Sequence, residues 1–172
     1  MDPVDKAKGA MGGLERLIAG LPGIAGYKNK EMRRDADKQV RDTFVNHLDE
    51  QRRRLVALQN DLLSAGGLAW MADLERLVSR TQLLMDRVRT ASYGYAPFFA
   101  LQKVREPELE RLAQFDRDLL NSLPKLSQTI DGLQAAVRAN KGVKEAAQVV
   151  ADLLVEMNDS FGQRAEAMLA AE

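Results

Sequence analysis

Four stretches of the chain repeat apolar residues at alternating spacings of three and four, and this periodicity constrains the fold more than any other feature. The stretches cover about residues 28–65, 68–91, 106–139 and 143–170. Because 3.6 residues make one turn of a helix, residues at these spacings line one side and leave the other side polar. The sequence therefore predicts four long amphipathic helices, each with one apolar stripe to bury.

Three breaks separate the four stretches. Gly66-Gly67 suits the left-handed turn that ends many helices, and residues 140–142 form a second tight turn. Residues 92–105 contain glycine and proline, which interrupt helices, so we expect a connection there. The two short turns make each pair of helices fold back on itself.

Pro124 lies inside the third stretch. Proline lacks an amide hydrogen and kinks or breaks a helix, but the apolar residues keep one phase on both sides of it. The unbroken phase favours a single kinked helix. The alternative is a true break, with Ser122 capping a new helix.

Each stripe must be buried against another, which predicts an all-α fold. Two antiparallel hairpins stacked on their stripes form an up-down-up-down four-helix bundle with long helices. A short N-terminal amphipathic helix precedes it, so we divide the chain into an N-terminal segment, residues 1–26, and a bundle, residues 27–172. The chain has 172 residues, of which 45% are hydrophobic and 29% charged, and this composition is typical of a globular domain with a core.

Two charged residues interrupt the stripes of the second hairpin. Asp116 and Arg164 lie equally far from the turn at residues 140–141, so the hairpin places them face to face. We expect a structural polar pair that fixes the register of the helices. The alternative leaves both residues on the solvated edge of their stripes. In the first hairpin the same reasoning places Gln51 near Thr81 or Gln82.

The residue types that catalysis needs are scarce. The chain has no cysteine, and its one histidine, His47, lacks the glutamate three residues before it that di-iron bundles use. Glu31 and Asp35 share a helix face, but the basic residues around them favour ion pairing over a metal site. We therefore predict no catalytic residue, no metal and no cofactor. A metal-dependent enzyme is the third hypothesis, behind two non-enzymatic ones.

Two clusters are candidates for a contact surface. Residues 28–54 hold nine basic and six acidic residues, either as a solvated helix with ion pairs or as a docking surface for an anionic group or an acidic partner. Four of the nine aromatic residues fall within residues 93–99, where they either cap the core or anchor an interface. The candidate interface residues are Tyr27, Lys30, Arg33, Arg34, Tyr93, Tyr95, Phe98 and Phe99.

Residues 1–26 differ in character from the bundle. Their few apolar residues and the basic residues Lys6, Lys8 and Arg16 could bind a membrane surface, but docking onto the bundle is the fate we favour. The chain has no spanning-length apolar run and no signal-peptide pattern, so we expect a cytoplasmic protein, with a place at the inner membrane face left open. A net charge of zero argues against nucleic acid as a partner.

Two sequence strings, GYKNKEMRRD at residues 26–35 and RTASYGY at residues 89–95, resemble signatures of a family of bacterial helical-bundle proteins. The resemblance covers about residues 20–120 and implies no particular activity. The order of an amphipathic N-terminal segment and a helical hairpin is also similar to that of phage-shock-type membrane-stress proteins. The shorter hairpin and the weak apolar face of residues 1–26 depart from that pattern.

The sequence as a whole predicts a non-catalytic helical adaptor or assembly protein that binds a protein partner or itself. Its contact surface is expected at Tyr27–Arg41 and Tyr93–Phe99. The alternative is a peripheral membrane-associated stress protein that uses the N-terminal segment.

Overall fold

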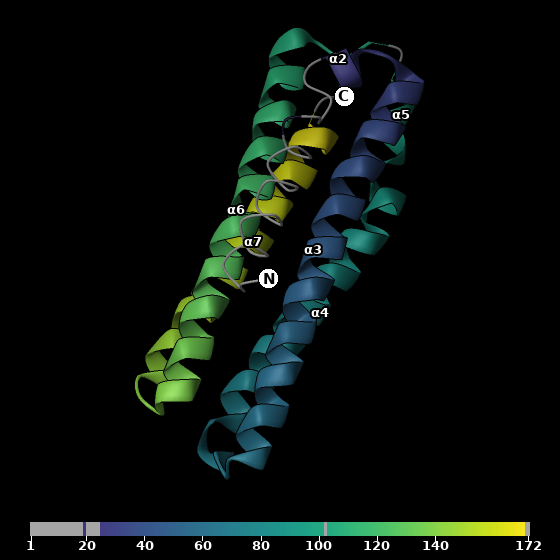
Figure 1. Cartoon of the computed structure of the whole chain (residues 1–172). Helices are drawn as coiled ribbons and strands as arrows, with labels where there is room; N and C mark the ends of the chain where they lie inside the picture. The colour runs from purple at the N-terminus through teal and green to yellow at the C-terminus, as the bar shows by residue number, and fades with distance from the viewer. Residues whose placement is uncertain (1–18, 20–24, 102, 171–172) are drawn as a thin grey trace.

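The computed structural model describes residue 19 and residues 25–101 and 103–170. Within these residues the chain is helical and has no strand, which confirms the predicted all-α class and a helical bundle (Figure 1). Most of residues 1–26, and with them the predicted N-terminal helix, lie outside the described part. The four long helices are α3 (Lys30–Ser64), α4 (Met71–Thr90), α6 (Glu106–Ala139) and α7 (Val143–Leu169). The shorter elements are α2 (Ala25–Lys28), η1 (Leu68–Trp70), η2 (Ala91–Tyr95) and α5 (Ala96–Ala100).

The long helices begin and end at residues whose chemistry explains the boundary. Asn29 separates α2 from α3, because its extended backbone breaks the helix while its side-chain oxygen accepts the Glu31 amide at 2.9 Å. Gly66 has a φ of 75° just after α3, and Gly142 has a φ of 68° just before α7. Both predicted tight turns are therefore confirmed.

Pro124 lies inside α6, which runs without a break from Glu106 to Ala139. The single-helix prediction is confirmed and the alternative break at Ser122 is wrong. The Ser122 hydroxyl bonds to the Leu119 carbonyl of its own helix instead of capping a new one.

The two hairpins stack so that each long helix packs mainly against two others. α3 packs against α4 and α6, and α7 packs against α6 and α4, so α4 and α6 stand at opposite corners. His47 lies beside Leu123, and further along the same helices Arg54 lies beside Ser127. Because the residue numbers of both helices increase along the same direction, α3 and α6 lie side by side and parallel.

The connection between α4 and α6 crosses the end of the bundle, since it joins opposite corners. Residues 92–105 are not simply irregular, as the glycine and proline suggested. They contain the end of η2 and the whole of α5. Proline is tolerated there because Pro97 lies in the first turn of α5, where no intrahelical bond needs its amide. In Figure 1, α2 and α5 lie at this end and the two tight turns at the other.

The apolar interior has two parts. The larger part runs along all four long helices and holds the leucines of the predicted stripes. The smaller part lies under the crossing connection and brings α2, η2 and α5 onto the ends of α3, α6 and α7. Its buried members are Tyr27, Ala36, Tyr95, Phe98, Phe99, Val104, Leu109, Leu112 and Met168.

Candidate functional site

A buried ionic network lies beside this smaller part of the core. Arg164 of α7 donates from Nε to Asp116 Oδ1 at 2.5 Å and from Nη1 to Asp37 Oδ1 at 2.8 Å. The side chains of Arg164 and Asp37 are fully buried and that of Asp116 nearly so. The structure thus brings Asp116 and Arg164 together as the hairpin register predicted, and it excludes the alternative on a solvated edge.

Two further side chains complete the network. Arg41 donates from Nε to the second oxygen of Asp37 at 2.8 Å, and the Tyr27 hydroxyl donates to the second oxygen of Asp116. The network therefore holds two guanidinium groups and two carboxylates, whose formal charges cancel. Such balance is what allows charges to be buried, because each carboxylate keeps partners in place of water. The network links α2, α3, α6 and α7.

The electrostatics of the network fix its protonation. Burial raises the pKa of the Tyr27 phenol well above its usual value, and the neighbouring carboxylate of Asp116 raises it further, so Tyr27 stays a hydrogen-bond donor. Burial alone lowers the pKa of Arg164, but Asp116, Tyr27 and Asp37 more than reverse this and hold the guanidinium charged.

Aromatic rings cover the network from the crossing connection. The guanidinium carbon of Arg164 lies 6.0 Å from the ring centroid of Tyr95, and that of Arg33 lies 5.6 Å from the centroid of Phe98. Arg33 also donates from Nη1 to the Tyr27 carbonyl at 3.2 Å and from Nη2 to the Leu101 carbonyl. These bonds tie α2 and the connection to the first turns of α3.

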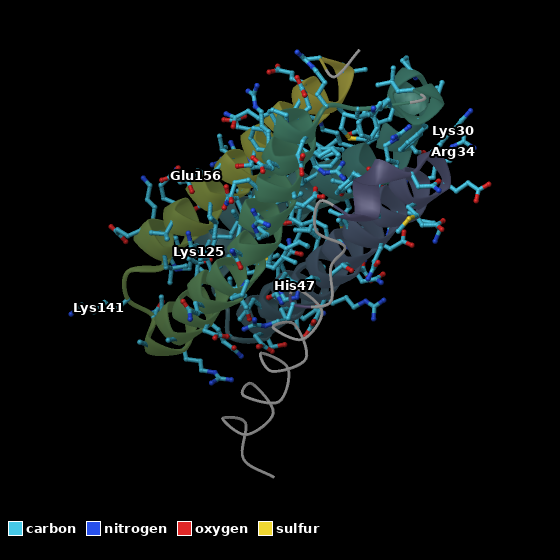
Figure 2. All side chains as sticks on the ribbon, turned by 90° about the horizontal axis from the view of Figure 1, so that it is seen from above. Lys30, Arg34, His47, Lys125, Lys141 and Glu156 are labelled. Atoms are coloured by element: carbon cyan, nitrogen blue, oxygen red, sulfur yellow. The ribbon has the colours of Figure 1, made fainter. Side chains whose placement is uncertain are left out.

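The predicted contact surface is corrected by this packing. Five of its eight residues are buried inside the chain, because the connection turns its aromatic side inward, and they cannot meet a partner without local unfolding. These are Tyr27, Arg33, Tyr95, Phe98 and Phe99. The burial of Tyr95, Phe98 and Phe99 agrees with core capping, the other role that we considered for the aromatic cluster. Lys30 and Arg34 are exposed at the start of α3 (Figure 2). Only the backbone of Tyr93 is described, so its part in the prediction is untested.

Asp37 is a buried member of the network that the sequence did not lead us to expect. It lies seven residues before Phe44 and three before Val40, so it continues the apolar stripe of α3 towards the N-terminus. Extending that stripe backwards from Phe44 would have shown a third charged residue on a buried face.

The polar layer predicted for the first hairpin differs in detail. Gln51 and Thr81 are both buried, but each bonds within its own helix. The Thr81 hydroxyl donates to the Leu77 carbonyl at 2.8 Å, and the Gln51 amide oxygen accepts from Arg54 at 2.8 Å. His47 is half-buried with Nε2 3.2 Å from the Leu123 carbonyl, and burial lowers its pKa.

The outer face of α7 carries a row of acidic residues along its whole length. Four of them recur every seven residues, which is nearly two helical turns, and the fifth, Glu156, falls between the second and third, so all five lie along one side of the helix. The row consists of Glu145, Asp152, Glu156, Asp159 and Glu166, all exposed. Among the described residues none of the five forms an ion pair, whereas on α3 Asp42 pairs with Lys38 and Asp49 with Arg52 and Arg53. Figure 2 shows Glu156 on the side of the molecule away from Lys30 and Arg34.

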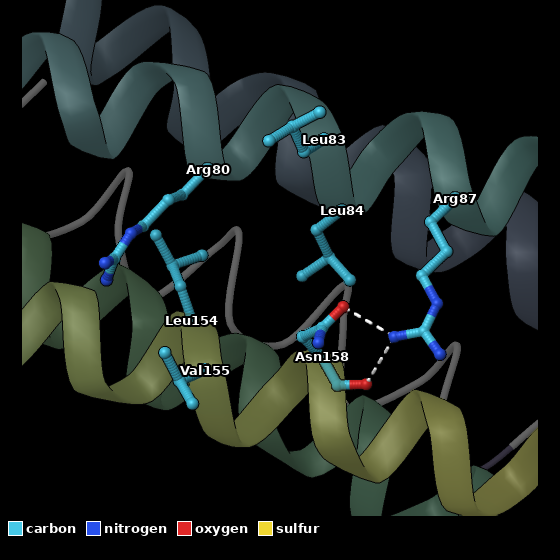
Figure 3. A pocket seen from close by; sticks show the side chains of 7 residues that line it. All are labelled: Arg80, Leu83, Leu84, Arg87, Leu154, Val155 and Asn158. Carbon is cyan, nitrogen blue, oxygen red and sulfur yellow. Dashed lines mark hydrogen bonds between the residues drawn. The ribbon is translucent and has the colours of Figure 1, made fainter.

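Beside this row, α4 and α7 border a shallow hollow of about 370 Å³ (Figure 3). Leu84 and Leu154 form its apolar floor, and Arg87 spans it by donating from Nη1 to the Asn158 side-chain oxygen at 2.6 Å and to its carbonyl at 3.0 Å. Two apolar side chains at its rim are strongly exposed, Leu83 at 68% and Val155 at 47%.

A comparison with protein-family models, curated proteins and solved structures finds no match to this chain. In the described part of the chain, no helix has the length and apolar character that crossing a membrane requires. The same residues contain no group of three or more side chains arranged to hold a metal ion.

Proposed function

We propose that the protein is a non-catalytic helical adaptor or assembly protein, and that the exposed face of α4 and α7 is its contact surface. In this proposal the two antiparallel hairpins form an up-down-up-down bundle in which the neighbouring helices α3 and α6 run in the same direction. The ionic network acts structurally, holding the ends of the helices, α2 and the crossing connection in one rigid unit. The contact surface differs from the one that the sequence predicted, because most of that surface is buried.

The acidic row of α7 is the observation that carries the proposal. A charged helix that only faces water usually carries both signs, with partners three or four residues away, as α3 does. In the part of the chain that the structure describes, the outer face of α7 instead presents five carboxylates without an ion pair, and the exposed side chains of Val155 and Leu83 lie beside it. Exposed apolar residues rimmed by unpaired charge are typical of a protein-binding surface.

A photo-crosslinking amino acid placed at Val155, which is exposed at the rim of the α4–α7 hollow, tests the proposal in the native cell. The same group at Glu50, which is exposed on α3, is the matched control. We expect covalent adducts with protein, identified by mass spectrometry, from position 155 and not from position 50. If neither position yields a protein adduct, or both yield the same ones, the α4–α7 face is not a contact surface.

A separate experiment tests the alternative in which residues 1–26 bind a membrane. Co-sedimentation with anionic vesicles compares the full chain with a chain that lacks residues 1–24. An adaptor without a membrane role leaves both chains in the supernatant. Loss of sedimentation on truncation would favour the peripheral membrane protein.

A further inference from the structure

We infer that the partner of the α4–α7 face is a second copy of this chain, and that the two copies form a dimer with a twofold axis parallel to the long helices. The inference rests on the proposed function and names the partner of the same surface. Three properties of the face carry it: its two rows of opposite charge, their common spacing, and their matching heights along the bundle.

The face carries a basic row next to an acidic one. On α4, Arg80 and Arg87 lie seven residues apart with Leu83 between them, and all three border the hollow. On α7, Asp152 and Asp159 also lie seven residues apart, with Val155 between them. Seven residues span about 10.5 Å of helix, so both rows repeat charge, apolar residue and charge over the same distance.

The two rows are also level with each other. Arg87 bonds to Asn158, and Leu84 and Leu154 share the floor of the hollow (Figure 3). Residues of α4 therefore lie at the height of α7 residues numbered about 71 higher, and both helices run in the same direction. On this scale Arg80 is level with Asp152, Leu83 with Val155, and Arg87 with Asp159, each within about one residue or 1.5 Å.

A twofold axis parallel to the helices brings residues of equal height into contact across the interface. The rotation lays α4 of one copy on α7 of the other and leaves every height unchanged. Arg80 then meets the partner's Asp152, Leu83 meets the partner's Val155, and Arg87 meets the partner's Asp159. Each contact occurs twice because the interface is symmetric. An axis across the helices would instead lay α4 on α4 and bring arginines against arginines.

The charge pattern also favours a second copy over an unrelated partner. A purely basic partner would match the acidic row and be repelled by Arg80 and Arg87, and a purely acidic partner would have the opposite problem. A surface with both signs in parallel rows is complementary to itself. Among the described residues, the Asp152 carboxylate accepts one side-chain hydrogen bond, from Gln148 of the same helix at 2.7 Å. Its second oxygen therefore remains available to a partner.

Sedimentation velocity of the full chain, from micromolar to millimolar concentration, tests the dimer. The variants Arg80→Glu and Asp152→Lys each place like charges across the interface twice, and we expect each to dissociate the dimer at least tenfold more readily. Mixing the two variants should restore a dimer, because the mixed pair has Glu against Lys in one half and Arg against Asp in the other. Arg53→Glu, at an exposed position on α3, is the control and should dimerise like the wild type.

Three results would overturn the inference: a wild-type chain that stays monomeric up to millimolar concentration, a dimer unaffected by both reversals, or reversals that the mixture does not rescue. Circular dichroism of each variant separates loss of the dimer from loss of the fold. The proposed function fails separately. If the wild type is monomeric but position 155 still crosslinks to another protein, the face binds a different partner and only the dimer is wrong.

Discussion

Replacement of Arg164 by methionine probes the buried ionic network where the most bonds meet. The change keeps an unbranched side chain of similar reach but removes the guanidinium that bonds to Asp37 at 2.8 Å and to Asp116 at 2.5 Å. Both carboxylates then remain buried, with Arg41 and Tyr27 as their remaining partners. Removing one partner of a buried ion pair costs about 3–5 kcal/mol. At about 2–4 °C per kcal/mol for a chain of this size, the Tm should fall by about 6–20 °C.

Urea unfolding followed by circular dichroism at neutral pH measures this loss. Arg53→Met is the matched control, because it removes the same charge from a side chain that is 75% exposed, and such changes usually stay within about 0.5 kcal/mol. A double-mutant cycle with Asp116→Asn should give a coupling energy of about 0.5–3 kcal/mol. If Arg164→Met costs no more than Arg53→Met, the network does not hold the end of the bundle together and the structural role assigned to it is wrong.

Three further predictions concern single positions. Burial and Asp116 hold the pKa of Tyr27 well above its ordinary value of about 10. Only the unfolded chain ionises this tyrosine as the pH rises above about 10, so the free energy of unfolding should fall there. Urea midpoints measured from pH 8 to 11 should show that this part of the fall disappears in Tyr27→Phe. Burial lowers the pKa of His47, so the unfolded chain binds the proton more readily and stability should fall as the pH drops below about 6.5; an unchanged slope between pH 7 and 5 in His47→Gln would contradict this. Gly132 lies in α6 with open space where the Cβ of an alanine would lie, whereas Gly142 has a φ of 68°. Thermal melts should therefore show that Gly132→Ala stabilises the fold by about 0.5–1 kcal/mol and that Gly142→Ala destabilises it by about 1–2 kcal/mol. Equal effects of the two substitutions would contradict the turn geometry.

The sequence predicted the parts of this fold that depend on local periodicity. The apolar spacing located all four long helices, because a stripe of leucines every three or four residues has to be buried. The continuity of α6 through Pro124 followed from the same phase. The pairing of Asp116 with Arg164 was predictable because two helices joined by a short turn have a fixed register, so counting from the turn is enough.

The remaining features depend on how the hairpins stack, which periodicity does not specify. Asp37 reaches Arg164 only because α3 packs beside α6 and brings a third helix to the pair. Tyr95 of η2 and the phenylalanines Phe98 and Phe99 of α5 are buried because the connection crosses between opposite corners of the bundle. Composition alone could not tell a ring that covers a core from one that anchors an interface, so both roles stayed open for Phe98 and Phe99, whose rings are buried in the structure.

Hydroxyl-radical footprinting of concentrated and dilute protein tests directly whether the α4–α7 face, rather than the aromatic end, is the contact surface. We expect Leu83 and Val155 to become protected from oxidation on association, while Leu63, which is 53% exposed beside the turn that follows α3, reacts equally in both samples. Protection that spares Leu83 and Val155, or that appears instead at Lys30 and Arg34, would contradict it.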